Sequence, residues 1–187
     1  MQTYISFLRG LNMAGHNSVR MTDLVTLYRD EGYKDAETYI QSGNVVFRDL
    51  ADLTAPAIST KIEKAIHEKF NYEIAILIRT IDEMKKLISA NPFLKIEKFD
   101  PSKMAVLLLS EKATTAQIQK VINISYPPDE FRIIGSEIFI YCPNGFGRTK
   151  LYSNFFEKKM NVTGTARNWN TINKLLEIAE KKQPAGN

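Results

Sequence analysis

Two polar segments of the chain concentrate the residue types that bind small ligands. Residues 9–17 read Arg-Gly-Leu-Asn-Met-Ala-Gly-His-Asn and directly follow an apolar run typical of a strand. Residues 164–171 read Gly-Thr-Ala-Arg-Asn-Trp-Asn-Thr and directly precede a run with helical apolar spacing. Loops at the ends of regular elements commonly carry the binding groups of a protein. The two segments therefore predict a binding site, although they specify no reaction.

The first segment has the composition of an anion site between a strand and a helix. Backbone N–H groups and the start of the helix attract negative charge, and Arg9 and His16 add positive charge. Gly15 allows a ligand to approach the backbone closely, and Asn12 and Asn17 offer directional hydrogen bonds. The alternative is structural, because both asparagines can instead hydrogen-bond their own loop and cap the helix. The glycine spacing matches neither a dinucleotide fingerprint nor a P-loop.

The second segment has the same two interpretations. In the functional one, Arg167 reaches toward the first segment, and Asn168 and Asn170 complete a polar pocket between the two halves of the chain. In the structural one, Asn168 or Thr165 caps the last helix, Trp169 packs beneath it and Arg167 pairs with a carboxylate.

Two further places belong to the candidate site. Ser42 and Asn44 lie in and after a turn with hairpin chemistry, and they either join the polar pocket or serve the turn alone. Residues 143–150 carry two glycines, Arg148 and Lys150 before a helix that Thr149 is expected to cap, which suits a phosphate or carboxylate. An ordinary glycine-rich turn with exposed cations explains the same residues equally well.

Catalytic and metal-binding patterns are weak in this chain. His16 is the one side chain suited to general acid/base work, and its neighbours supply no orienting carboxylate. We therefore assign no catalytic residue, leave the cofactor unknown, and favour a binding protein over an enzyme of unknown reaction centred on His16. One cysteine and two histidines cannot supply a zinc cluster, while a carboxylate site for a hard metal stays open.

Charge is unevenly distributed along the 187 residues, which carry a net charge of +4. Residues 1–79 have a net charge of −1 and residues 80–187 a net charge of +5. The basic half favours anionic partners, a small anionic or nucleotide-like ligand first and RNA as the alternative. RNA-recognition modules stack bases on strand aromatics, for which Tyr4, Phe139 and Tyr141 are the candidates.

The composition is that of an ordinary globular protein, 44% hydrophobic and 25% charged. No segment approaches the roughly 20 unbroken apolar residues of a membrane helix, and no secretory signal is recognisable. Cys142 has no intramolecular disulfide partner and falls in an apolar strand. We expect a cytoplasmic protein without a membrane partner.

The elements that must position these residues follow a repeated order. Residues 1–79 and residues 103–166 each read as β-α-β-β-α-β, which predicts an α+β fold of two tandem ferredoxin-like units with antiparallel sheets. Residues 80–102 are expected to form a connector helix and loop, and residues 167–187 a C-terminal helix and tail. The expected strands are residues 3–8, 36–40, 44–48, 73–79, 103–109, 130–134, 137–142 and 161–165; the expected helices start near residues 21, 55, 81, 115 and 150 and at the end of the second segment.

Several of these strands are apolar on both faces, among them residues 74–78 and residues 105–109. A two-layer unit normally leaves one face of its sheet in water, so this pattern predicts that the second face is covered. The other unit or a second chain can do so, and we favour the other unit. The oligomeric state stays open.

Three segments, in this order, carry a resemblance to a known family: residues 9–17, residues 39–47 (Tyr-Ile-Gln-Ser-Gly-Asn-Val-Val-Phe) and residues 163–171. The chain resembles, nearly from end to end, the mostly bacterial family called domain of unknown function 1697. The resemblance implies the tandem ferredoxin-like fold and brings no activity. The marked positions of the family fall on Arg9, Gly10, Asn12, Gly15, Asn17, Tyr39, Gln41, Ser42, Gly43, Asn44, Arg167, Asn168, Trp169 and Asn170.

Overall fold

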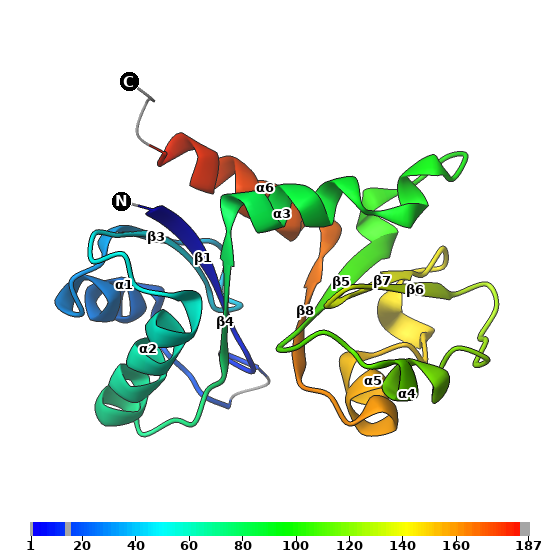
Figure 1. The fold of residues 1–187 in the computed structure, drawn as a ribbon, viewed down its shortest axis with the longest axis horizontal. Coiled ribbons are helices and arrows are strands. Elements are labelled where there is room, and N and C mark those ends of the chain that lie inside the picture. Colours follow the sequence, from blue (N-terminus) through cyan, green and yellow to red (C-terminus); the bar gives the residue numbers. More distant parts are fainter. Residues whose placement is uncertain (1, 14–15, 184–187) are drawn as a thin grey trace. The chain divides into compact units, whose positions relative to one another are not determined.

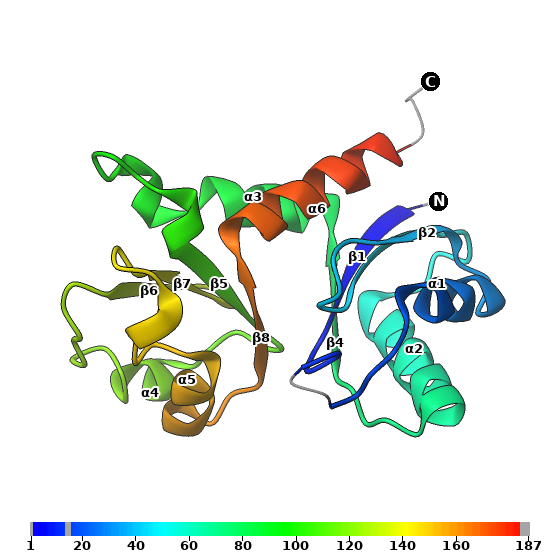
Figure 2. The same cartoon turned by 180° about the vertical axis from the view of Figure 1, so that it is seen from behind.

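The computed structural model describes residues 2–13 and 16–183 (Figures 1 and 2). In this part of the chain, six α-helices accompany eight strands, and the strands form two four-stranded antiparallel sheets. The predicted α+β class is therefore confirmed. Each sheet has two helices on one face, as the alternation of strands and helices along the chain requires.

The first sheet contains β1 (Gln2–Leu8), β2 (Lys34–Thr38), β3 (Asn44–Asp49) and β4 (Ile76–Thr80) in the order β2-β3-β1-β4. The helices α1 (Met21–Asp30) and α2 (Ala55–Phe70) cover one face. Their apolar sides share a core with alternate strand residues, because side chains one residue apart on a strand point to opposite faces. This core includes Tyr4, Leu8, Tyr28, Phe47, Ile58 and Ile62.

The second sheet repeats the arrangement with β5 (Met104–Leu109), β6 (Glu130–Ile134), β7 (Glu137–Tyr141) and β8 (Gly164–Asn168), ordered β6-β7-β5-β8. The helices α4 (Thr115–Gln119) and α5 (Ser153–Met160) lie on one face. Their core includes Leu107, Val121, Ile138, Leu151, Phe156 and Met160.

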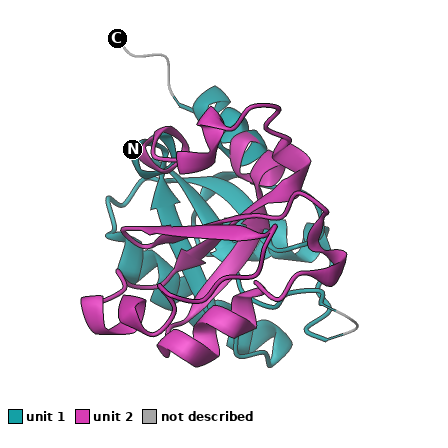
Figure 3. Ribbon diagram, turned by 90° about the vertical axis from the view of Figure 1, so that its right-hand side faces the viewer, with its two compact units in different colours: residues 1–85, 174–187 teal, residues 86–173 magenta. Residues whose placement is uncertain are grey.

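The chain divides into two compact units, Met1–Lys85 with Lys174–Asn187, and Lys86–Asn173 (Figure 3). Both α3 (Ile81–Ser89) and α6 (Trp169–Lys181) cross this division. The C-terminal part of α6 belongs to the first unit, where Lys182 Nζ lies 2.7 Å from Glu37 Oε2 on β2. In the same unit, Lys85 Nζ of α3 lies 2.9 Å from Glu180 Oε1 of α6. Residues 167–187, predicted to be one separate segment, are thus shared between the units.

Side-chain caps stabilise the starts of several helices. The Thr54 hydroxyl accepts a hydrogen bond from the Ala57 N–H at the start of α2. At the start of α3, Thr80 and Glu83 form a reciprocal capping box, with the Thr80 N–H donating to Glu83 Oε2 over 2.8 Å. The α3 helix ends before Asn91 and Pro92, where a proline would disfavour further helix.

Several predicted boundaries are wrong; β2, for example, spans Lys34–Thr38 rather than residues 36–40. The last strand runs over Gly164–Asn168 rather than residues 161–165, because Asn161 ends α5 in a left-handed conformation and the chain pairs with β5 only afterwards. The helix expected to start near residue 115 begins there but is short, spanning only Thr115–Gln119. The strand predicted for residues 73–79 begins three residues later, although Ile74 is buried.

The face of each sheet that points away from its helices is buried, as the all-apolar strands predict. Ile5, Phe7 and Val46 occupy this face in the first sheet, and Val106 and Phe139 in the second, all with no exposed surface. The expectation that the other unit provides the cover stays a prediction. None of the helices described is long and apolar enough to span a membrane.

Candidate functional site

The first polar segment is a loop between β1 and α1 that Asn12 holds together. Its side-chain Nδ2 donates to the carbonyl oxygens of Val19 and Gln41, each over 3.0 Å, and its Oδ1 accepts the Val19 N–H over 2.8 Å. The Asn17 Nδ2 donates to the Gly10 carbonyl over 3.2 Å. Neither asparagine caps α1, whose N-cap residue is Arg20. Both asparagines thus hydrogen-bond their own loop, as the structural interpretation predicts, but neither caps the helix.

This loop and the β2–β3 turn meet within the first unit. The Leu8 N–H donates to the Gly43 carbonyl over 2.8 Å, which adds to the bond between Asn12 and Gln41. A Cβ atom on Gly43 would lie 2.9 Å from Leu8 Cβ, so this close approach requires a glycine. Asn44 is fully buried and donates to the Tyr39 carbonyl and to Ser42 Oγ. The structure thus brings Asn12, Ser42 and Asn44 into one neighbourhood.

Two further predicted residues of the first segment, Arg9 and His16, lie at the surface of the protein. Arg9 is exposed, and its N–H donates to the Ala75 carbonyl over 2.9 Å. His16 is also exposed, and its N–H donates to the Met13 carbonyl over 2.8 Å. Gly15 lies outside the described residues.

Arg167 lies on β8, on the sheet face away from α4 and α5. Only 8% of its surface is exposed, and burial lowers the pKa of its guanidinium to about 10. Its Nη1 donates to Thr165 Oγ1 over 2.7 Å and to the Ala166 carbonyl over 2.8 Å. The predicted loop arginine is therefore a strand residue.

The last helix is capped as the structural interpretation predicts. Asn168 Oδ1 accepts the Thr171 N–H over 2.9 Å, and Trp169 is buried. Asn170, also a predicted site residue, is exposed at the first turn of α6.

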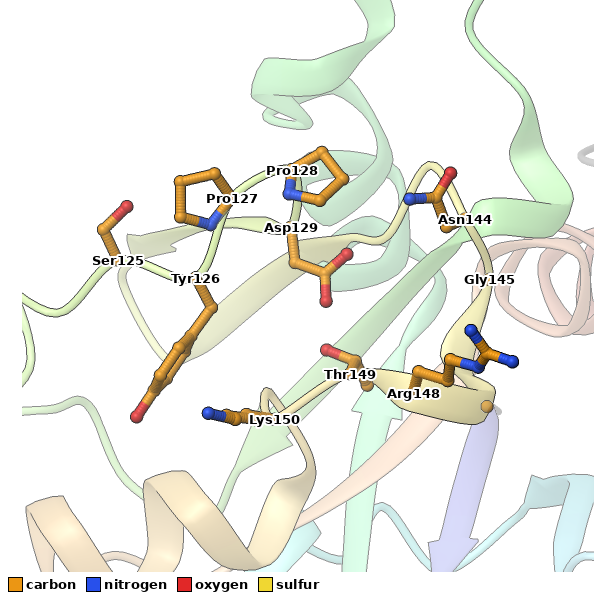
Figure 4. A pocket seen from close by; sticks show the side chains of 11 residues that line it. Ser125, Tyr126, Pro127, Pro128, Asp129, Asn144, Gly145, Arg148, Thr149 and Lys150 are labelled. Atoms are coloured by element: carbon orange, nitrogen blue, oxygen red, sulfur yellow. The ribbon is translucent and has the colours of Figure 1, made fainter.

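A pocket in the second unit lies where β6 begins and β7 ends (Figure 4). It has a volume of about 700 Å³, and residues 125–129 and 144–150 contribute its lining. The pairing of Glu130 with Tyr141 places both segments at the same end of the β6–β7 hairpin. The pocket includes Arg148 and Lys150, the two cations predicted for a phosphate or carboxylate site.

Asp129 and Thr149 both line this pocket, and the buried Cys142 lies beside Thr149. The Cys142 thiol lies 3.4 Å from Thr149 Oγ1, which also accepts the Leu151 N–H over 3.0 Å. Burial raises the pKa of the Cys142 thiol, and the nearby Asp129 carboxylate raises it further. In Figure 4 the Asp129 carboxylate points toward Thr149. Thr149 does not cap α5, because α5 begins at Ser153.

Tyr126 and Lys150 form one side wall of the pocket. The Lys150 Nζ lies 5.2 Å from the centre of the Tyr126 ring, a cation–π distance. Figure 4 shows Arg148 and Asn144 on the other side of Asp129. Positive charge thus flanks one carboxylate on two sides.

Tyr126 and Asp129 are pocket residues that the sequence reasoning missed. A usable signal existed, since a two-residue turn at Gly135 and Ser136 sets the register of the hairpin, and that register places position 129 opposite Cys142. Extending the pairing by one residue beyond β6 would have predicted Asp129 beside the glycine-rich segment.

The aromatic residues considered for RNA binding are all buried. Tyr4 packs on Phe47 in the helix-side core, and Phe139 and Tyr141 are 0% and 7% exposed. None of them offers the open ring face that base stacking requires. Across residues 2–13 and 16–183, no three His, Cys, Asp or Glu side chains lie close enough to hold a metal ion.

Comparison with known proteins supports the fold and the family. A solved structure, that of the conserved bacterial protein SP0830 from Streptococcus pneumoniae, matches with a TM-score of 0.71 and 18% identity, covering 95% of this chain and 98% of that chain. No curated protein matches. The family model described as "Protein of unknown function (DUF1697)" matches residues 1–139, which include the first two of the three resembling segments. The chain therefore belongs to the DUF1697 family of proteins of unknown function.

Proposed function

We propose that this protein binds a small anionic or nucleotide-like ligand in the pocket between residues 125–129 and 144–150. The observation that carries the proposal is a cavity of about 700 Å³ lined by Arg148 and Lys150. Small-molecule pockets typically measure about 300–1,000 Å³ and contain a few converging polar groups. Both cations are exposed, so a ligand can reach them.

The sequence-based placement of the ligand differs, since it puts Arg9 and Arg167 at the site, at the interface of the two units. The two placements predict different mutational effects and so can be separated by experiment. We also infer that both units are ferredoxin-like, which the identical strand orders β2-β3-β1-β4 and β6-β7-β5-β8 support. The cytoplasm is the compartment in which to seek the ligand, because the single cysteine has no intramolecular disulfide partner.

A thermal-shift screen with pyrophosphate, nucleotides and dicarboxylates tests the proposal. We expect at least one anion to raise the Tm, and Arg148→Ala to remove the shift. Lys159→Ala is the matched control, because it removes one exposed cation of the same unit outside the pocket. Loss of the shift in Arg9→Ala and Arg167→Ala, with Arg148→Ala unaffected, would instead support the sequence-based placement. No stabilisation by any anion would overturn the proposal.

A further inference from the structure

Opposite charges line the same pocket without neutralising each other. Asp129, Arg148 and Lys150 all contribute to the lining. Within the described part of the chain, none of the three forms a salt bridge. Elsewhere on the surface oppositely charged side chains do form salt bridges, for example Lys174 Nζ with Glu177 Oε2 at 2.9 Å. The pocket therefore offers separate places for an anionic group and for hydrogen-bond donors of one ligand.

The carboxylate is held in place by its own turn. The Asp129 N–H donates to the Tyr126 carbonyl over 2.9 Å, and the two residues form an isolated bridge. The Cys142 thiol lies close enough to this carboxylate that the negative charge raises the pKa of the thiol. An ionised carboxylate has about four lone-pair sites, so most of its acceptor capacity remains for a ligand. Two adjacent hydroxyl groups on a ligand fit the two carboxylate oxygens.

Three lining residues of the pocket carry ring side chains with large apolar surfaces. Tyr126, Pro127 and Pro128 follow one another in the chain and all line the pocket, and in Figure 4 the Tyr126 ring points toward Lys150. The Lys150 ammonium group lies over the ring of Tyr126, and a flat heterocycle of a ligand can compete for the same ring face. A free phosphate would leave most of the 700 Å³ cavity unfilled.

From these three features together we infer that the ligand is a ribonucleoside phosphate. The phosphate groups bind Arg148 and Lys150, the ribose hydroxyls donate to Asp129, and the base lies against Tyr126 and the two prolines. This inference rests on the proposed function and adds the class of ligand and the role of the carboxylate. A zwitterionic amino acid is the competing ligand, since it also carries both kinds of group but leaves the apolar wall uncovered.

Isothermal titration of the full chain with four probes tests the inference: adenosine diphosphate, its 2′,3′-dideoxy analogue, pyrophosphate and glutamate. We expect the ribonucleotide to bind at least about tenfold more tightly than the dideoxy analogue, because a hydrogen bond to a charged group contributes about 1.5–3 kcal/mol. In Asp129→Asn this ratio is expected to fall toward one, while pyrophosphate affinity is kept or rises. Glu130→Gln is the matched control, because it neutralises the adjacent carboxylate, which does not line this pocket.

Each other outcome counts against a distinct statement. Equal binding of the ribonucleotide and the dideoxy analogue, with pyrophosphate bound, overturns the role of Asp129 and leaves the anion site standing. Preference for glutamate overturns the nucleotide class. Absence of binding by all four probes counts against both the inference and the proposed function. The wild-type comparison of the two nucleotides stands by itself if Asp129→Asn does not fold.

Discussion

At the scale of single residues, the asparagines of the first segment are engaged by their own backbone. Asn12 and Asn17 both adopt left-handed backbone conformations, with φ of 54° and 50°. Asparagine tolerates this conformation better than most residues because its side chain can bond locally. In Asn12 that side chain makes three hydrogen bonds and ties the loop to the β2–β3 turn. Its chemistry is therefore already used in stabilising the site region.

Asn12→Ala is expected to destabilise the protein more than Asn17→Ala. Both substitutions place alanine at a positive φ, so backbone strain is similar in the two variants. Only Asn12→Ala loses three hydrogen bonds, and we expect its free energy of unfolding to be lower than that of Asn17→Ala by about 1–3 kcal/mol. Urea unfolding of both variants measures the difference. Equal stabilities would show that the Asn12 bonds do not hold the loop.

Gly43→Ala is expected to be much more damaging than Gly32→Ala. Both glycines have positive φ, 70° and 92°, so alanine is strained at either position by about 1–2 kcal/mol. The new Cβ at position 43 would also lie 2.9 Å from Leu8 Cβ and 3.1 Å from Leu11 Cβ, whereas nothing lies within 4 Å at position 32. We expect a further loss of roughly 1–3 kcal/mol for Gly43→Ala in denaturant unfolding. Similar losses in the two variants would argue against the close packing of loop and turn.

At the scale of elements, the β6–β7 hairpin creates the pocket. Its register places residues that are 13 positions apart in the chain, Asp129 and Cys142, at the same end of the sheet. The glycine-rich segment, residues 143–150, follows β7 and lies at this end of the sheet, and its own Thr149 is buried. The pocket is thus a consequence of strand pairing, and its residues need not be close in sequence.

The cap of α6 is a second feature at this scale, and Asn168→Ala tests it. Asn168 Oδ1 accepts the Thr171 N–H, while the exposed Asn170 side chain has no hydrogen bond among the described residues. We expect Asn168→Ala to lower the free energy of unfolding by about 1 kcal/mol and Asn170→Ala to change it by much less. Thermal and urea unfolding provide the measurement. A larger loss in Asn170→Ala would contradict a purely structural role for Asn168.

At the scale of the whole molecule, buried phenols predict how stability depends on alkaline pH. Burial raises the pKa of Tyr33 to about 12 and that of Tyr28 further, both from 10.0. Because the pKa of each phenol is higher in the folded protein than in the unfolded chain, the unfolded chain loses these protons first. The free energy of unfolding is therefore unaffected by these groups below pH 10 and falls as the pH rises above 10. We expect each phenol to contribute a loss of up to about 1.4 kcal/mol per pH unit between pH 10 and 12. Urea unfolding across this range measures the slope.

Phenylalanine substitutions separate the two phenols. The Tyr33 hydroxyl is buried without a hydrogen-bond partner among the described residues, so Tyr33→Phe should keep or raise stability at pH 7 and reduce the alkaline slope. The Tyr28 hydroxyl lies 2.7 Å from Ser6 Oγ, and Tyr28→Phe should cost about 1 kcal/mol at pH 7. An unchanged slope in both variants would assign the alkaline loss to other groups.

The doubly apolar strands lead to a prediction about assembly. We expect the two units of one chain to cover each other's apolar sheet faces, so that the protein is a monomer in dilute solution. Sedimentation velocity between about 1 and 100 µM tests this expectation. A stable dimer at the lowest concentration would assign the cover to a second copy instead.

Local signals in the sequence determined most of the fold. Alternating apolar strand residues, helical apolar spacing and caps such as Thr54, Thr80 and Glu83 act within a few positions, so the order of elements and the α+β class follow from them. The errors fall where local signals compete, as at Asn161, where a left-handed residue delays the start of β8.

Tertiary structure alone decided which polar residues share a site. The sequence identified Arg148 and Lys150 as cations beside glycines, but only the pairing of β6 with β7 brings Asp129 and Tyr126 to them. Strand pairing also decided the position of Arg167. The sequence predicts this residue in a loop, whereas in the structure it is buried on β8. Sequence patterns report the conformation of neighbours along the chain, whereas a pocket depends on contacts between distant segments, and these are fixed only when the sheet assembles.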